Sequence, residues 1–207
     1  MSNPDQYGIR ASVESFNVVL SAYAERGDVG HALSTLFSFE MCGLKPNADS
    51  YSFAMEVLGK DVHRRRKEDK FRKREATVTQ TVLDKNLDAA DEILTKMEAQ
   101  GIEPTADLIR NYIELLCLSG EINTATSVIN DLLQSGQRSI VNNKTIYRVA
   151  IANADSGQFE TAREVESALT EPIRSLESAI RSREQRHYHL KSLHQKEQSG
   201  QAEVEVT

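Results

Sequence analysis

The sequence predicts an all-α fold, a solenoid of about four helix-turn-helix repeats followed by a C-terminal capping helix. The main observation is a 35-residue pattern that occupies Val13 to Asn47 and recurs at equal length from Ala106 to Ile140. The composition, 39% hydrophobic and 27% charged, suits amphipathic helices. No apolar run approaches the roughly 20 residues that a membrane span requires. Stacked repeats bury their apolar faces against their neighbours, so we expect function on an extended surface.

The first repeat, 13–47, consists of two apolar runs at helical spacing, separated by Gly27 and Asp28, which interrupt the pattern. The third repeat, 106–140, has the same organisation, with its interruption at Gly120. Because the two segments agree in length and register, we expect both to fold as the same helix-turn-helix unit.

The second repeat, 48–105, begins and ends like the first but spans 58 residues. The 23 additional residues predict an insertion at about 60–83, between the two helices of this repeat. No Gly or Pro lies between Asp61 and Val82, and few residues there are apolar. The insertion is therefore expected to prolong the first helix or to form a mobile loop, rather than to pack into the core.

The rest of the chain predicts a fourth, degenerate repeat at 141–170 and a capping helix at 171–197, with Pro172 in its first turn. We expect residues 198–207 to form a disordered tail. Residues 1–12 match the end of a repeat, so the chain is expected to begin inside a preceding repeat or with a disordered segment.

The repeat length and the closing sequences GLKPN (43–47) and GIEPT (101–105) resemble the pentatricopeptide repeat family. The resemblance covers roughly Gly8 to Leu169. It implies a right-handed α-solenoid that binds single-stranded RNA along the concave face of its first helices, with one base read per repeat. Tetratricopeptide repeats are the nearest alternative, but they run about 34 residues and carry an early Trp, which this chain lacks.

The resemblance also implies a mitochondrial or chloroplast location. A targeting segment is expected to be missing from this sequence, because such segments are Arg- and Ser-rich and poor in acids. The first ten residues instead carry Asp5 and run into a repeat.

In the resembled family, the residues that read a base are the fifth and the last of each repeat. The matching positions are Asn17 and Asn47 in the first repeat, Ser52 and Thr105 in the second, and Arg110 and Ile140 in the third. The Asn pair implies a pyrimidine. The second repeat departs from the usual Asp or Asn ending, which leaves its base open, and the third fits no familiar pair, although Arg110 can meet a phosphate. Alternatively, Asn17 is a polar helix-surface residue and Asn47 a turn residue after proline.

Charge is distributed unevenly along the chain. The formal net charge is −6, but the segment 64–74, which we call the basic arm, carries +6, so the remainder carries about −12. Clustered Lys and Arg are the groups that bind nucleic-acid phosphates. The candidate phosphate ligands are Arg64, Arg65, Arg66, Lys67, Lys70, Arg72, Lys73 and Arg74. The alternative is a solvated charge run without a partner.

The sequence contains no pattern typical of catalysis. His187, His189 and His194 lack metal-ligand spacing, and nothing matches the His-x-Glu and Cys-x-x-Cys signature of zinc deaminases. We expect no catalytic residue, no metal site, no cofactor and no small-molecule substrate. Cys42 and Cys117 are expected to be free thiols.

The sequence therefore favours a non-catalytic protein of organellar RNA metabolism that binds single-stranded RNA along its repeats. One alternative is a scaffold subunit of an organellar ribonucleoprotein, such as a ribosome, in which the repeats bind protein subunits and the basic arm binds ribosomal RNA phosphate. The departures at Arg110 and Ile140 and the acidic remainder favour this alternative. Another is a protein–protein adaptor without RNA contact. No membrane partner is expected.

Overall fold

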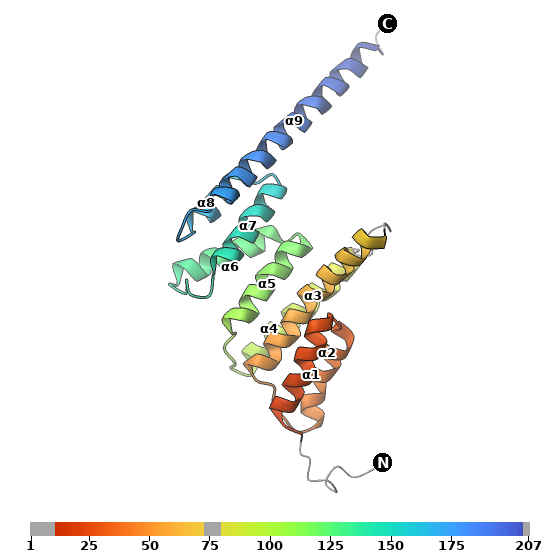
Figure 1. Ribbon diagram of the computed structural model, residues 1–207, viewed down its shortest axis with the longest axis vertical. Helices are drawn as coiled ribbons and strands as arrows, with labels where there is room; N and C mark the ends of the chain where they lie inside the picture. Colours follow the sequence, from red (N-terminus) through yellow and green to blue (C-terminus); the bar gives the residue numbers. More distant parts are fainter. Residues whose placement is uncertain (1–10, 73–79, 205–207) are drawn as a thin grey trace. The chain divides into compact units, whose positions relative to one another are not determined.

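The computed structural model describes residues 11–72 and 80–204, which form nine α-helices and no strand (Figure 1). The chain divides into two compact units, Met1–Glu121 and Ile122–Thr207. The helices are α1 (Val13–Arg26), α2 (Val29–Met41), α3 (Ala48–Arg72), α4 (Gln80–Ala99) and α5 (Ala106–Ser119) in the first unit, and α6 (Ile122–Gln134), α7 (Asn143–Asp155), α8 (Phe159–Ser167) and α9 (Arg174–Val204) in the second. The predicted all-α helical-repeat fold is confirmed.

The helix ends follow from local side-chain chemistry. Ser12, Thr105 and Asn142 precede α1, α5 and α7, and each accepts a hydrogen bond from the backbone N–H three residues later. Asp28 does the same for α2 through the N–H of His31. Gly27 ends α1 in the left-handed conformation that glycine adopts without strain. These signals are local, which is why the sequence places the turns well.

In the first unit, α3 is the central helix. It lies against α1 on one side and α5 on the other, and α2 and α4 pack onto this layer. The largest fully buried side chains of this core are Leu20, Phe39, Tyr51, Met55, Leu58, Met97, Leu108, Ile113, Leu115 and Leu116. The helices that begin the repeats therefore share one layer, as expected for stacked helix pairs.

In the second unit, α7 packs against α6, α8 and α9. The fully buried residues of this unit include Ile129, Ile146 and Ile180. The apolar side chains in the middle of α9 are in contrast largely exposed, with Tyr188 59% and Leu190 56% accessible. Only the first part of α9 therefore packs against the repeat.

The insertion in the second repeat continues α3 to Arg72, the helical one of the two expected forms, and α4 begins at Gln80. Residues 73–79 lie outside the described part of the chain. A charge-rich segment can prolong a helix in this way because it contains no Gly or Pro, and because Arg, Lys and Glu have high helix propensity.

The C-terminal helix differs from the expectation. It extends to Val204, so residues 198–204, which the sequence predicted to be disordered, are helical. The segment is rich in Gln, Glu and Ala and lacks Pro, and its one glycine, Gly200, costs only about 1 kcal/mol in a helix. Residues 1–10, expected to end a preceding repeat, and 205–207 lie outside the described residues. Within the described helices, none is both long and apolar enough to cross a bilayer.

Candidate nucleic-acid interface

The predicted reader pair of the first repeat is joined by a direct hydrogen bond. Asn17 lies in the second turn of α1, and Asn47 immediately precedes α3, which packs beside α1. Asn17 Nδ2 donates to Asn47 Oδ1 at 3.1 Å. The structure therefore brings together two side chains that are 30 residues apart in the sequence.

A third residue, Ser50, completes this cluster and was not predicted. Its side chain is fully buried, and its hydroxyl donates to Asn17 Oδ1 at 2.6 Å. Asn47 and Ser50 also cap the start of α3 reciprocally: Ser50 N donates to Asn47 Oδ1, and Asn47 N donates to Ser50 Oγ. The spacing Asn-x-x-Ser before a helix resembles a capping box, and this signal could have identified Ser50.

These bonds determine what the Asn pair offers to a ligand. Both side-chain carbonyl oxygens already accept hydrogen bonds within the cluster. Asn47 Nδ2 has no acceptor among the described residues, and Asn17 Nδ2 uses only one of its two hydrogens. Because Asn47 is exposed, the cluster presents N–H donors to the outside.

The predicted reader pair of the second repeat has the opposite polarity. The hydroxyls of Ser52 and Thr105 are 2.6 Å apart, and Ser52 Oγ donates to Ala48 O at 2.9 Å. With the Ser52 hydrogen thus occupied, the Thr105 hydroxyl donates to Ser52 Oγ, and the N–H of Leu108 donates to Thr105 Oγ1. Both hydroxyl hydrogens are used, so this pair can only accept hydrogen bonds from a ligand.

A pocket of about 450 Å³ opens beside the second pair, between α3 and the start of α5. Its lining residues are Asp49, Ser52, Phe53, Glu56, Thr105, Asp107 and Asn111. Two of the three carboxylates are paired with cations: Glu56 with Lys60 at 2.6 Å, and Asp107 with Arg110 at 2.5 Å. Arg110, predicted to meet RNA, is therefore engaged with a neighbouring acid, and Ile140 is half-buried in the other unit.

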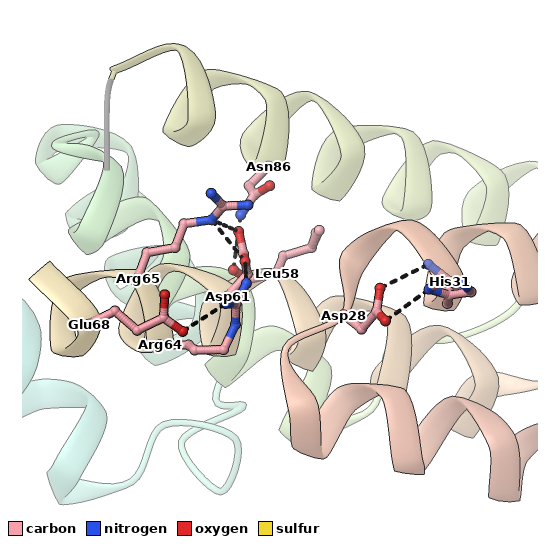
Figure 2. Close-up of polar contacts among 8 residues, drawn as sticks. All are labelled: Asp28, His31, Leu58, Asp61, Arg64, Arg65, Glu68 and Asn86. Atoms are coloured by element: carbon pink, nitrogen blue, oxygen red, sulfur yellow. Dashed lines mark hydrogen bonds and ion pairs between the residues drawn. The ribbon is translucent and has the colours of Figure 1, made fainter. Parts of the chain in front are cut away.

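The first two arginines of the basic arm converge on one buried carboxylate (Figure 2). Asp61 is only 2% exposed, and it accepts from Arg65 Nε at 2.9 and 2.8 Å and from Arg64 Nη2 at 2.7 Å. Arg64 Nη1 also donates to Glu68 at 3.0 Å. Burial lowers the pKa of the Arg64 guanidinium, but hydrogen bonds to Asp61 and Glu68 outweigh it and leave the pKa raised. The ion pairs thus hold both arginines on Asp61.

The remaining part of the arm is only partly described. Arg66 Nη2 donates to the carbonyl of Leu118 in the last turn of α5, and Lys67 is exposed. Lys70 and Arg72 lie on α3, whereas Lys73 and Arg74 fall outside the described residues. His63, one turn before Arg66, contacts Glu114 of α5 at 2.7 Å. The arm therefore begins as a helix anchored to α5. Among the described residues, no group of three or more His, Cys, Asp and Glu side chains could hold a metal ion.

Comparisons with known proteins agree with this architecture. The family model of the pentatricopeptide repeat domain matches residues 1–61 and 76–116, and the unmatched residues between them include the basic arm. No curated protein matches the sequence. Among solved structures, the maize pentatricopeptide repeat protein PPR10 is similar with a TM-score of 0.67 and 18% identity, over 96% of this chain and 25% of that one.

Two Arabidopsis thaliana proteins also share the fold. Nuclear protein-only RNase P 2 (PRORP2) has a TM-score of 0.62 and 14% identity over 81% of this chain and 33% of its own. The PPR domain of protein-only RNase P 1 (PRORP1), solved in complex with tRNA, has a TM-score of 0.62 and 12% identity, over 87% of this chain and 84% of its own. This chain spans about a third or less of PRORP2 and of PPR10. With its stacked helix pairs and the family-model match, the chain belongs to the pentatricopeptide repeat family.

Proposed function

We propose that this protein binds single-stranded RNA along the layer formed by α1, α3 and α5, and that it acts by binding rather than by catalysis in organellar RNA metabolism. The observation that carries the proposal is the pairing of the predicted readers, Asn17 with Asn47 and Ser52 with Thr105, at successive repeats. The similar PRORP1 domain, solved with tRNA, supports an RNA ligand for this fold. A mitochondrial or chloroplast location is proposed from the family resemblance.

The polarity of the two pairs suggests which bases they favour. The donors of Asn17 and Asn47 match the carbonyl oxygens of uracil or cytosine, in agreement with the pyrimidine that the family pairing implies. The Ser52 and Thr105 hydroxyls, which can only accept, match a base edge that carries N–H groups. A well-formed base contact contributes about 1 to 3 kcal/mol of discrimination. Two such contacts give a preference rather than recognition of a unique transcript.

The test is a fluorescence-anisotropy titration with uridine-rich and adenosine-rich single-stranded RNA at several salt concentrations. Asn17→Ala should reduce the preference for uridine-rich RNA by about tenfold, the lower part of the range for one lost base contact. Asn130→Ala, which removes an exposed Asn from α6, is the matched control and should leave the preference unchanged. An unaltered preference in Asn17→Ala would contradict base reading by this pair.

A second candidate function is that of a ribonucleoprotein scaffold, with protein on the repeats and ribosomal RNA on the basic arm. The carboxylates of Asp49, Glu56 and Asp107 around the second reader pair favour it, since they disfavour an RNA backbone along this face. This scaffold should bind RNA without base preference and with a steep salt dependence that disappears when the arm is neutralised. A protein adaptor would bind neither the uridine-rich nor the adenosine-rich RNA at any salt concentration.

A further inference from the structure

A second pocket, of about 440 Å³, lies where the turn between α1 and α2 meets α3. It is lined by Arg26, Gly27, Asp28, Val29, Gly30, Asp61, Arg64 and Arg65. Its three arginines come from two distant segments, the end of α1 and the start of the basic arm. We propose that this pocket binds a phosphate group of the RNA. The inference rests on the proposed function and adds a defined phosphate site, away from the base-reading pairs.

The buried carboxylate of Asp61 orients two of the arginines before any ligand binds. Arg65 contacts Asp61 through Nε alone, so both of its terminal nitrogens keep their N–H donors (Figure 2). Arg64 uses one N–H on each terminal nitrogen, for Asp61 and for Glu68. Since a guanidinium has five donors, both side chains can hold Asp61 and still bind an anion. Their rotamers are determined by the ion pairs, which lowers the entropic cost of binding.

Arg26, at the end of α1, contributes the third cation of the pocket lining. Its guanidinium is exposed, and among the described residues no acid or carbonyl is bonded to it. The pocket is therefore not a closed network of ion pairs, because one of its three arginines keeps its full donor set. An incoming anion can therefore pair with Arg26 without breaking a bond that stabilises the fold.

The N-terminus of α2 adds backbone N–H donors to the same pocket. The first turn of α2 carries Val29 and Gly30, whose N–H groups precede the first intrahelical bond, that of Ala32 to Asp28. The positive end of this 13-residue helix therefore opens beside the arginines. Gly30 has no side chain to obstruct access, and the atom nearest to a Cβ there would be Asp28 Oδ1 at 4.0 Å.

The charge of the lining favours an anion. Asp28 and Asp61 offset two of the three arginines, and both carboxylates are already occupied, Asp28 by His31 and Asp61 by the arginine pair. The exposed Lys67 follows on α3, and Lys70 and Arg72 lie further along the same helix. An RNA backbone that places one phosphate in the pocket would therefore continue along further cations, which a free phosphate ion would not use.

The experiment compares Arg26→Ala with Arg174→Ala in the full chain. Both remove an exposed arginine for which the described residues provide no partner, but Arg174 is at the start of α9, outside the pocket. The probes are a uridine-rich RNA and, separately, inorganic phosphate. We expect Arg26→Ala to weaken RNA binding about tenfold and to reduce the salt slope by about one. Arg174→Ala should leave affinity and slope unchanged, and Arg26→Lys should restore only part of the affinity because Lys lacks the planar fork.

Equal weakening by Arg26→Ala and Arg174→Ala would overturn the pocket, because it would indicate attraction by net charge alone. Binding of inorganic phosphate that depends on Arg26, with RNA binding that does not, would overturn RNA as the source of the phosphate. Asn17→Ala separates the two proposals in the same assay. If it abolishes base preference while Arg26→Ala has no effect, only the pocket fails. If Arg26→Ala weakens RNA binding while Asn17→Ala leaves the base preference unchanged, only base reading fails.

Discussion

Replacing Gly27 by Ala tests how closely the first turn approaches α3. Gly27 has a φ of +64°, and a Cβ placed there would lie 3.1 Å from Asp61 N and 3.2 Å from Asp61 Cα and Lys60 C. Carbon atoms in good contact are about 3.5 to 4.0 Å apart. All three neighbours are backbone atoms of α3, so they cannot move aside by a side-chain rotation. Gly43 provides the matched control, with a φ of +68° and no other atom within 4 Å of the Cβ position.

The two substitutions share one cost and differ in another. Ala in the left-handed region costs about 1 to 2 kcal/mol at either position. Gly27→Ala must in addition push the turn away from α3, and overpacking of this kind costs about 1 to 3 kcal/mol. We therefore expect Gly43→Ala to lower the free energy of unfolding by about 1 to 2 kcal/mol and Gly27→Ala by about 2 to 5 kcal/mol.

Urea unfolding followed by far-ultraviolet circular dichroism measures the difference. Stability in a stacked-repeat protein is local, so hydrogen exchange should be measured in parallel to show where protection is lost. For Gly27→Ala, the loss should concentrate in α1, α2 and the part of α3 around Asp61. Equal shifts of the two midpoints, with no selective loss of protection at Asp61, would refute the packing argument.

Two further predictions concern single side chains. Burial raises the pKa of the Cys117 thiol to about 12, while Cys42 is exposed. A disulfide reagent at about pH 8 should therefore modify Cys42 rapidly, and Cys42→Ser should abolish this fast phase. Equally fast modification of Cys117 would contradict the prediction. Burial, and then the hydrogen bond to Asp91, raise the pKa of Tyr112 to about 12. The folded chain favours the neutral phenol, so the contribution of Tyr112 to stability is present below about pH 10 and is lost as the pH rises toward 12. Over this range, the urea midpoint of Tyr112→Phe should therefore fall less steeply with pH than that of the wild type. Equal slopes would contradict the prediction.

The sequence by itself determined the helical repeats and most of their ends. The N-caps Ser12 and Thr105 and the turn at Gly27 act on backbone groups within a few residues, so their effect can be read along the chain. The repeat period also predicts the insertion at about 60–83, as a departure from the 35-residue length. The limit of such local reasoning is visible at residues 198–204, where composition suggested a disordered tail but the helix continues.

Only the tertiary structure decided which polar side chains meet. The family resemblance marked Asn17 and Asn47 as readers, but the burial of Ser50 and the orientation of both amides depend on α1 packing beside α3. Likewise, the sequence showed a run of cations in the arm, whereas the structure places Arg64 and Arg65 on Asp61 and brings Arg26 to the same pocket. The physical reason is range: capping and periodicity act within one turn of chain, while ion pairs and buried hydrogen bonds join residues that only the packing of helices brings together.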